Sequence, residues 1–414
     1  MRVLILGNGA REHAITWKFS QSRRIAGLFV APGNAGTSGV ATNLPHVDPC
    51  DPQAVLDACQ GFRINHVFIG GEDPLAAGVS DALIEAGIPC IGPRRKTAQL
   101  ETSKAFSKAF MERNGIPTAR ANAFTYFPAF ERFIRERDRR LVLKKSGLAA
   151  GKGVLESDDT DEMLAYGKNV LETDTLVVED HLVGYEVSVF ALTDGVTHRL
   201  LPCCTDYKKA GDGGTGPNTG GMGSICPVPW LENTAWERIQ NEIVEPTFTA
   251  LRSEGLSFVG VLYFGIMVTA DGPFVLEYNL RFGDPEAQVL LPLIRADFGD
   301  LCEAMTKQRL SEFSIEVSPK SSVGVVVAAK GYPGPYETGI PVTGLPAGDS
   351  TLVFHAATSE RDGVTLTGSG RCFTVVGRGK ELLDAMNTAY NAVASVRFDG
   401  AWYRRDIGGR IFGN

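Results

Sequence analysis

The segment from Phe274 to Leu290 combines strand character with regularly spaced polar side chains. Hydrophobic and aromatic residues alternate with polar ones as far as Phe282, and Gly283-Asp284-Pro285 ends the pattern. Because side chains alternate between the two faces of a strand, Glu277, Asn279 and Arg281 are expected to share one face. The opposite face is expected to carry Leu276, Tyr278 and Leu280.

This spacing is suited to a metal site. Neighbouring side chains on one face of a strand are about 6.6 Å apart, so the Glu277 carboxylate and the Asn279 amide oxygen can reach one hard cation such as Mg²⁺. Arg281 would then face the anion that the metal holds. The alternative is a half-buried strand with a solvated face and a surface salt bridge.

Length and charge set the class of protein. A chain of 414 residues exceeds one hydrophobic core and indicates two to four domains. Its 43% hydrophobic and 21% charged residues are typical of a globular protein. With a net charge of −7 and a pI near 5.5, it carries no overall basic surface for nucleic acid or an anionic membrane.

The cysteines and the first residues indicate a cytoplasmic protein. The eight cysteines form no Cys-x-x-Cys motif, and Cys203 is directly followed by Cys204, which fits neither a zinc site nor a disulfide framework. The opening residues lack the apolar core of a signal peptide, and no apolar run approaches the roughly 18 residues of a membrane span.

The N-terminus predicts a doubly wound domain. An apolar strand at Arg2–Leu6 leads through the glycine turn Gly7–His13 into a helix, whose N-terminus can bind an anion. A dinucleotide fingerprint needs a third glycine where this chain has Glu12, and no acid follows the second strand near Gly27–Val30. A nicotinamide enzyme is therefore not expected.

Further strands are predicted at His66–Ile69 and Cys90–Ile91, with loops at 70–74 and 92–93 that gather at the ligand-binding edge of the sheet. Thr102 or Ser103 is expected to cap the next helix, which ends before Gly115. Lys104 lies in its first turn, where a cation opposes the helix dipole. It is therefore either solvated or held by an anion.

A glycine-rich hairpin follows between Leu141 and Leu155. Its loop carries Lys144, Lys145 and Lys152, but Gly153 stands where a P-loop has its hydroxyl residue. We interpret it as a phosphate-cradling hairpin that can fold over a nucleotide, the alternative being a plain glycine-rich turn.

Two acids flank the next turn. Glu179 and Glu186 could accept hydrogen bonds from an adenine amino group and a ribose hydroxyl, or they could be solvated carboxylates. The segment Asp206–Gly223 is too rich in glycine to pack a core and is either a linker or a loop whose backbone approaches a ligand. Lys208 favours the ligand loop. A helix with a kink at Pro246 is predicted over 233–253, and a strand over 259–268 is expected to pair with the Phe274 strand.

Together these motifs resemble the ATP-grasp ligases, through Lys144, the loop Gly147–Gly153, Glu179, Glu186 and the Glu277-x-Asn279 pair. More narrowly, they are similar to the glycinamide ribonucleotide synthetases over essentially the whole chain. That similarity is carried by residues 7–13, 31–36, 216–223, 281–288, 331–334 and 370–371. The chain departs from the family pattern in two places. The family usually has Lys-Ala-Asp-Gly where this chain has Lys144-Lys145-Ser146-Gly147, and Gly-Pro-Glu-x-Pro-Leu where this chain has Gly70-Gly71-Glu72-Asp73-Pro74-Leu75.

The resemblance implies an α/β architecture in three parts. These are an N-terminal Rossmann-like, doubly wound domain over 1–101, an ATP-grasp domain over 102–309 with a mobile lid subdomain near 119–185, and a strand-rich C-terminal domain over 310–414. It also implies a magnesium- or manganese-dependent, ADP-forming ligase of purine biosynthesis. Such an enzyme joins glycine to 5-phosphoribosylamine through glycyl phosphate.

The resemblance further implies roles for individual residues. Arg281 and Lys144 would be catalytic, and Glu277 and Asn279 would hold the metal. ATP would be bound by Lys104, Lys144, Gly147, Gly151, Lys152, Gly153, Glu179 and Glu186. Glycine and phosphoribosylamine would be bound by Gly9, Arg11, Glu12, Asn34, Glu72, Asp206, Lys208, Thr215, Gly216, Pro217, Asn218, Asp284, Pro285 and Glu286.

Two other functions are compatible with the same nucleotide site. One is another ATP-grasp ligase or carboxylase with a different acceptor, although the motifs at 216–223 and 281–288 argue against it. The other is a non-catalytic nucleotide sensor, which would have no reason to keep metal ligands together with Arg281. The expected protein is a monomer with small-molecule partners and no nucleic acid or membrane partner.

Overall fold

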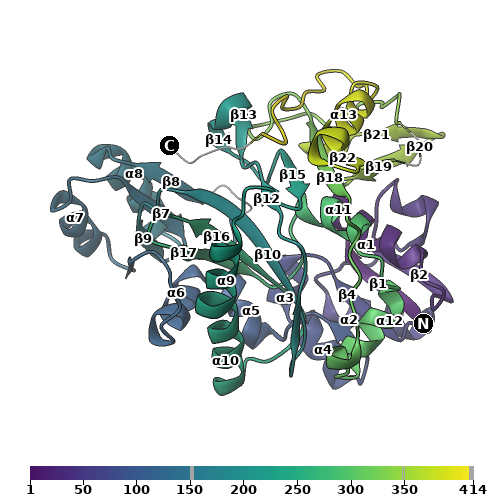
Figure 1. The fold of residues 1–414 in the computed structure, drawn as a ribbon, viewed down its shortest axis with the longest axis horizontal. Coiled ribbons are helices and arrows are strands. Elements are labelled where there is room, and N and C mark those ends of the chain that lie inside the picture. Colours follow the sequence, from purple (N-terminus) through teal and green to yellow (C-terminus); the bar gives the residue numbers. More distant parts are fainter. Residues whose placement is uncertain (150–152, 347, 349, 410–414) are drawn as a thin grey trace.

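The N-terminal part is the doubly wound domain that the sequence predicts. The computed structural model describes residues 1–149, 153–346, 348 and 350–409. Its first sheet is parallel, in the order β3 (Thr42–Asn43), β2 (Gly27–Pro32), β1 (Arg2–Gly7), β4 (His66–Ile69) and β5 (Cys90–Ile91). Helices α1 (Ala10–Ser20), α2 (Pro52–Gly61), α3 (Glu72–Ala77), α4 (Val79–Glu85) and α5 (Arg95–Thr102) accompany it (Figure 1).

Strand β1 is buried on both faces, which explains its unbroken apolar run. Val3 and Ile5 belong to one hydrophobic core, while Leu4 and Leu6 belong to another on the opposite face. A parallel strand covered on both sides needs such a run, because neither face meets water. The core that contains Val3 and Ile5 continues into α12 (Phe298–Thr306), so the N-terminal domain is packed against the central part of the chain.

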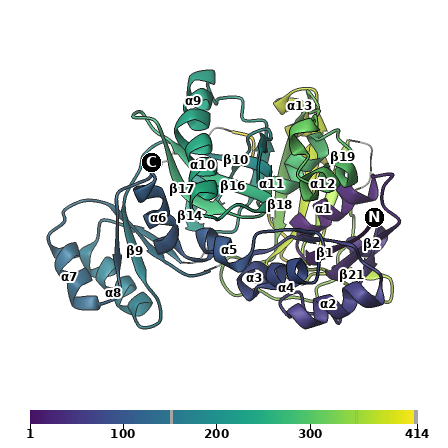
Figure 2. The ribbon, with the colours of Figure 1, turned by 90° about the horizontal axis from the view of Figure 1, so that it is seen from below.

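A small antiparallel sheet with its own core follows. Its order is β6 (Ala121–Phe124), β9 (Leu176–Asp180), β7 (Leu141–Lys145) and β8 (Val154–Ser157), with α7 (Phe127–Arg135) and α8 (Thr160–Leu171) packed on it. We call this unit the small sheet. It extends to one side of the molecule in both views (Figures 1 and 2). The predicted hairpin is confirmed, since β7 pairs antiparallel with β8.

The central sheet contains the strand predicted to begin at Phe274. It is antiparallel, in the order β11 (His198–Leu200), β10 (Tyr185–Asp194), β16 (Val259–Val268) and β17 (Pro273–Asn279). Helix α6 (Lys104–Arg113) precedes the small sheet in the chain. Ser103 is its N-cap, because the Ser103 hydroxyl accepts a hydrogen bond from the Phe106 N–H.

The helix predicted over 233–253 forms with a local change of winding. Helix α9 (Asn233–Arg238) continues through a π-helical segment (Ile239–Val244) into α10 (Glu245–Ser253). Pro246 lies in the first turn of α10 and has no N–H to donate to the preceding turn. The wider π turn before it accommodates this missing donor.

The C-terminal part is rich in strands, as predicted, but its sheet is not made from C-terminal residues alone. The order is β12 (Thr205–Asp206), β15 (Gly223–Cys226), β18 (Ser321–Ala328), β22 (Arg371–Gly379) and β19 (Thr351–His355), with α13 (Leu382–Val393) against it. Two smaller ribbons are β13 (Lys209–Gly211) with β14 (Thr215–Asn218), and β20 (Ser359–Arg361) with β21 (Val364–Leu366). Because β12 and β15 precede residue 310, the domain boundaries by residue number stay a prediction.

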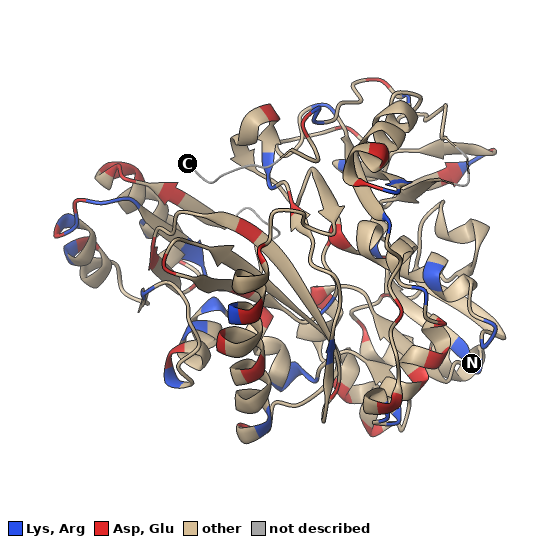
Figure 3. Cartoon of the chain, in the orientation of Figure 1, with Lys and Arg blue, Asp and Glu red and all other residues tan. Residues whose placement is uncertain are grey.

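Lys and Arg residues are interspersed with Asp and Glu over the ribbon (Figure 3). In the part of the chain that the structure describes, no helix is long and apolar enough to cross a membrane.

Candidate active site

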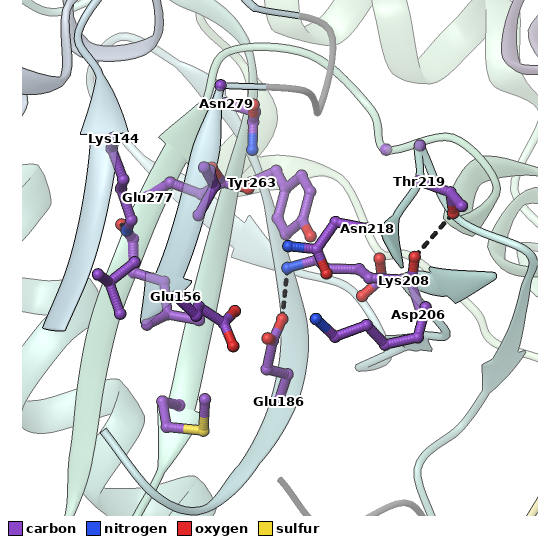
Figure 4. Close-up of a pocket in the computed structure, with 18 of the residues that line it drawn as sticks. Lys144, Glu156, Glu186, Asp206, Lys208, Asn218, Thr219, Tyr263, Glu277 and Asn279 are labelled. Atoms are coloured by element: carbon purple, nitrogen blue, oxygen red, sulfur yellow. Dashed lines mark hydrogen bonds and ion pairs between the residues drawn. The ribbon is translucent and has the colours of Figure 1, made fainter. Parts of the chain in front are cut away.

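A cavity of about 760 Å³ is lined by residues of the small sheet, the central sheet, α6 and the ribbon β13–β14. Sixteen of the residues predicted to form the site line it: Arg11, Glu72, Lys104, Lys144, Gly153, Glu179, Glu186, Asp206, Lys208, Gly216, Asn218, Glu277, Asn279, Arg281, Asp284 and Glu286. The close-up places Lys144, Glu277 and Asn279 on one side of this space and Asp206, Lys208 and Asn218 on the other (Figure 4).

Other predicted residues lie away from the cavity wall. Those that the structure describes outside the wall are Gly9, Glu12, Asn34, Gly147, Thr215, Pro217 and Pro285. Asn34 has a structural role, because its side chain connects three backbone segments. Its amide nitrogen donates to the Asn8 and His355 carbonyls, and its oxygen accepts from the Gly36 and Thr37 N–H groups. Gly151 and Lys152 lie outside the described residues.

Strand β17 presents its polar side chains to the cavity, but the expected alternation of faces is only partly correct. Glu277, Asn279 and Arg281 all line the cavity, and Leu280 is buried away from it. Leu276 and Tyr278, both expected on the opposite face, also line the cavity. For Leu276 the cause is a β-bulge: Gly265 pairs with Glu277 and Ile266 pairs with Val275, so Leu276 has no partner in the ladder.

Glu277 and Asn279 have the chemistry of a magnesium site. Burial alone would raise the pKa of the Glu277 carboxyl, but nearby Lys208, Lys144 and Lys104 lower it below its ordinary value, which favours the charged form. Among the described residues, no cluster of three or more His, Cys, Asp or Glu side chains could hold a metal. Two oxygen ligands fit Mg²⁺, which usually keeps water and substrate phosphates in its other positions.

Arg281 lines the cavity, yet its guanidinium is more fully paired than the sequence suggested. Its Nη2 lies 2.9 Å from Glu101 Oε1 and 3.1 Å from Asn279 Oδ1, and its Nε lies 3.2 Å from Glu72 Oε2. Burial opposes the charged form, but Glu101 and Glu72 raise the pKa of Arg281 above its ordinary value. Arg281 therefore bridges the end of α5, the start of α3 and the candidate metal ligand.

The acid that breaks the dinucleotide fingerprint takes part in the same network. The Glu12 carboxylate accepts from the Gly9 N–H at 2.7 Å and from Arg11 Nε at 2.6 Å. A Cβ at Gly7 would lie 2.4 Å from Glu12 Cγ, so glycine is required beside this side chain. The turn thus binds its own buried carboxylate at the position where a dinucleotide would place its pyrophosphate.

Glu72 connects that turn to Arg281. Arg281 lowers the pKa of Glu72 most strongly; burial opposes the shift and Arg11 adds to it, leaving a pKa of about 2. Arg11 Nη1 lies 3.6 Å from Glu72 Oε2. The two arginines and the acids between them therefore join the N-terminal domain to β17 across the cavity wall.

The predicted nucleotide residues are brought together from α6 and the small sheet. Lys144 Nζ on β7 lies 2.9 Å from Glu179 Oε2 on β9. Lys104 donates to the Gly147 carbonyl at 3.4 Å. Burial lowers the pKa of Lys104, and Glu277 opposes that shift. Cations thus surround the side of the cavity that holds Glu277.

The glycine-rich segment forms the opposite wall. Lys208 is ion-paired with Glu186 on β10 (Figure 4). Burial raises the pKa of Asp206 to about 8, although Lys208 opposes this shift. Gly216 and Asn218 line the cavity, whereas Thr215 and Pro217 on the same ribbon are exposed. Glu186 is therefore held at this wall by Lys208 rather than standing free.

Beyond the glycine-rich segment, the wall is completed by Asp284 and Glu286, which have fixed partners. Arg371 Nη1 lies 3.3 Å from Asp284 Oδ1. Burial would raise the pKa of Asp284, but Arg371 and Arg11 lower it below its ordinary value. Glu286 Oε1 accepts from the Ser188 hydroxyl at 3.0 Å.

Among the charged residues that sequence reasoning missed are Glu101, Lys108 and Arg371, which line the cavity, and Asp174, which binds the Gly147 N–H beside it. Lys108 could have been found, because it lies one helical turn after Lys104 and so shares its face of α6. Glu101, Asp174 and Arg371 act on residues that are distant in sequence, or that lie across a turn whose geometry the sequence does not specify.

Comparison with known proteins covers nearly the whole chain. The chain matches family models for phosphoribosylglycinamide synthetase: the N domain over residues 1–101, the ATP-grasp (A) domain over 102–287 and the C domain over 322–410.

Individual relatives cover the same span. A phosphoribosylamine–glycine ligase of Rhodopirellula baltica is 41% identical over 98% of this chain and 96% of that protein. The trifunctional purine biosynthetic protein adenosine-3 of Gallus gallus is 43% identical over 99% of this chain, which spans only 42% of that longer protein. The crystal structure of a phosphoribosylamine–glycine ligase from Thermotoga maritima superposes with a TM-score of 0.85 at 34% identity, covering 98% of this chain and 100% of that one.

Proposed function

Because this chain belongs to the phosphoribosylglycinamide synthetase family, we propose that it ligates glycine to 5-phosphoribosylamine, using ATP and releasing ADP and phosphate. The observation that carries this proposal is the cavity itself. One wall gathers Lys104, Lys144, Glu277 and Asn279, and the other presents the backbone of a glycine-rich ribbon.

The chemistry requires activation of a carboxylate. Glycine's carboxylate is a poor acyl donor because oxide is a poor leaving group. Attack of a carboxylate oxygen on the γ-phosphorus of ATP breaks the bond to ADP and gives glycyl phosphate. The amine of phosphoribosylamine then attacks the carbonyl carbon, phosphate leaves, and the attacking nitrogen loses a proton. In such reactions the protein acts mainly by positioning the reactants and by stabilising charge.

The residues on the cationic wall are suited to the first step. Lys104 and Lys144 would neutralise the ATP phosphates, and Glu277 with Asn279 would hold Mg²⁺ or Mn²⁺. A bound divalent ion would supply charge stabilisation on the phosphate oxygens. Arg281 reaches the cavity beside Asn279 and would stabilise the transferring phosphoryl group. Glycyl phosphate is hydrolysed by water, so the small sheet, as the lid near 119–185, would need to cover it.

The two acids predicted to bind the nucleoside have unequal freedom. Glu179 Oε1 is buried without a hydrogen-bond partner among the described residues, which leaves it available to a donor on the nucleotide. Glu186 is already ion-paired with Lys208, so a ribose hydroxyl would share that carboxylate. A monomeric state, a cytoplasmic location and the absence of nucleic-acid and membrane partners stay predictions.

Substrate omission tests the proposed reaction. The purified chain is incubated with ATP and Mg²⁺, and ADP is quantified with glycine, with phosphoribosylamine, with both and with neither. We expect rapid ADP release with stoichiometric amide product only when both are present. An ATP-grasp ligase with another acceptor would not respond to phosphoribosylamine, and a nucleotide sensor would bind ATP without turnover. Either result would contradict the proposal.

A further inference from the structure

Lys108 is a buried lysine in the cavity wall that the proposed mechanism does not use. It lies on α6, one turn after Lys104, with only 8% of its surface exposed. Its Nζ donates to Thr118 Oγ1 at 2.6 Å and to the Ala119 carbonyl at 3.4 Å, and lies 3.2 Å from Glu179 Oε2. A lysine is costly to bury unless it is paired, so this position has a specific electrostatic partner.

That partner is the carboxylate of Glu179. Its Oε2 is shared by two ammonium groups, Lys144 at 2.9 Å and Lys108 at 3.2 Å. Its Oε1 is buried without a partner among the described residues, and the residue lines the cavity. Because both cations engage one oxygen, the other oxygen stays free for a ligand donor.

The same ammonium group reaches the segment that leads into the small sheet. Thr118 and Ala119 lie just ahead of β6, separated from it by Arg120, and Thr118 Oγ1 donates to the Val275 carbonyl of β17 at 2.7 Å. The Val275 N–H donates to the Pro117 carbonyl at 2.8 Å. Lys108 therefore joins three parts of the molecule: α6, the crossing at 117–119 that rests on β17, and β9 within the small sheet.

We propose that Lys108 is a positioning residue for the nucleotide site, an inference that rests on the proposed function. It fixes Glu179 and, through that shared carboxylate, Lys144. It also ties the start of the small sheet to α6, so that both groups are held where the nucleotide enters. Lys108 makes no contact with the reacting atoms in this account.

Nucleotide affinity measures this role without relying on turnover. ADP with Mg²⁺ is titrated calorimetrically into the wild-type chain and into Lys108→Met, which keeps the chain length and removes the charge. We expect the ADP Kd to rise about 10- to 100-fold, the range for losing a charged hydrogen bond. Lys168→Met is the matched control, because Lys168 is an exposed lysine on α8 of the same unit. The ADP Kd of Lys168→Met should stay within about twofold of wild type, because substitutions at exposed positions usually have small effects.

A double-mutant cycle separates positioning from a general loss of stability. If Lys108 acts through Glu179, then Lys108→Met should weaken ADP binding much less in a Glu179→Gln background than in wild type. Additive effects would overturn the proposal, as would an unchanged ADP Kd in folded Lys108→Met. If that variant does not fold, Lys108→Arg keeps the charge with different geometry. Near-wild-type affinity in Lys108→Arg would contradict a role that depends on this arrangement, whereas a weaker, Glu179-dependent affinity would support it.

Failure of this inference and failure of the proposed function are distinguishable. Glycine-dependent ADP release by the wild-type chain tests the reaction alone. Coupling between Lys108 and Glu179 in ADP affinity tests the positioning role alone. Coupling without glycine-dependent turnover would sustain the role of Lys108 while removing the ligase assignment. Glycine-dependent turnover without coupling would sustain the ligase assignment and remove the proposed role of Lys108.

Discussion

The carboxylate of Glu101 lies 2.9 Å from Nη2 of Arg281 and also accepts the Leu280 N–H at 2.6 Å. Glu101 ends the segment matched by the N-domain family model, whereas Arg281 follows β17 in the centre of the chain. This pair therefore fixes the arginine that faces the candidate metal ligands from a different part of the fold. The charge of Arg281 is therefore balanced by carboxylates before any substrate is bound.

Replacing Arg281 tests its role in charge stabilisation. We expect Arg281→Ala to lower turnover about 10²- to 10³-fold, the usual effect of removing one donor aimed at developing charge. The ADP Kd should change only several-fold, because the lysines and Glu277 remain. Turnover at saturation and calorimetric affinity are measured together. Loss of ADP binding with turnover intact would make Arg281 a nucleotide clamp instead.

The same variant should lose stability. Removing Arg281 leaves Glu101 and Glu72 without their shared partner, and breaking a buried pair in this way typically costs about 3–5 kcal/mol. Arg281→Lys keeps the charge but not the planar fork, so it should recover part of the stability and little of the turnover. Denaturant unfolding of the three proteins checks this order.

Replacing Glu277 tests the metal site. Glu277→Gln keeps the shape but removes the charge, so we expect the Mg²⁺ concentration for half-maximal activity to rise at least about tenfold. Asp271→Asn is the control, because Asp271 is exposed in the turn between β16 and β17. Mn²⁺ binding in the presence of ADP gives a second readout. Equal metal requirements in Glu277→Gln and the control would remove Glu277 from the site.

Asp174 supplies a carboxylate beside the phosphate hairpin, where the family usually has an acid at the position of Ser146. Asp174 Oδ2 accepts a hydrogen bond from the Gly147 N–H at 3.1 Å. The Ser146 hydroxyl oxygen instead accepts one from the Ala105 N–H at 3.1 Å. We expect Asp174→Ala to raise the KM for ATP about tenfold with little change in turnover, as one charged hydrogen bond is lost. Asp158→Ala, at an exposed loop position, should match wild type. An unchanged KM would mean that the hairpin needs no such anchor.

Acid should destabilise the junction between α1 and β19. Burial, with a smaller contribution from His355, lowers the pKa of His13 to about 3, and burial lowers that of His355 to about 4. His13 Nδ1 accepts the His355 N–H at 2.9 Å, which requires that nitrogen to be unprotonated. Both pKa values lie below the ordinary value of 6.5. Between each of these values and pH 6.5, the unfolded chain therefore binds more protons than the folded chain. Stability is thus complete above about pH 6.5 and falls as pH decreases toward 4, by at most about 1.4 kcal/mol per pH unit for each histidine.

Thermal unfolding between pH 7 and pH 5 checks this expectation. His13→Gln removes one titrating group and should flatten the decline in Tm with falling pH. His46→Gln is the control, because His46 is exposed and should leave the decline unchanged. An identical pH dependence in His13→Gln and wild type would show that the junction does not titrate.

Local signals in the sequence were sufficient for much of the fold. The apolar run of β1, the hairpin of β7 and β8, and the Ser103 cap each depend on neighbouring residues, and all are present. The extra residue at Leu276 could not be predicted, because a bulge is defined by the partner strand as much as by its own sequence. The π-helical segment before Pro246 likewise reflects how one missing donor is absorbed within a packed helix.

The sequence likewise predicted only part of the candidate site. Residue types and spacing indicated Glu277 and Asn279 as ligands of one cation, and the family resemblance implied that Lys104 and Lys144 bind the same nucleotide; all four line the cavity. Spacing could not reveal how Arg281 is paired, since its partners are separated from it by about two hundred residues and by several turns of the fold.

The fate of glycine's carboxylate oxygen tests the central claim most directly. Glycine labelled with heavy oxygen in its carboxylate is turned over with ATP and phosphoribosylamine, and the inorganic phosphate is analysed by mass spectrometry. If the cavity forms glycyl phosphate, one labelled oxygen enters phosphate in each turnover. Label in AMP, or unlabelled phosphate despite formation of the amide product, would contradict the account.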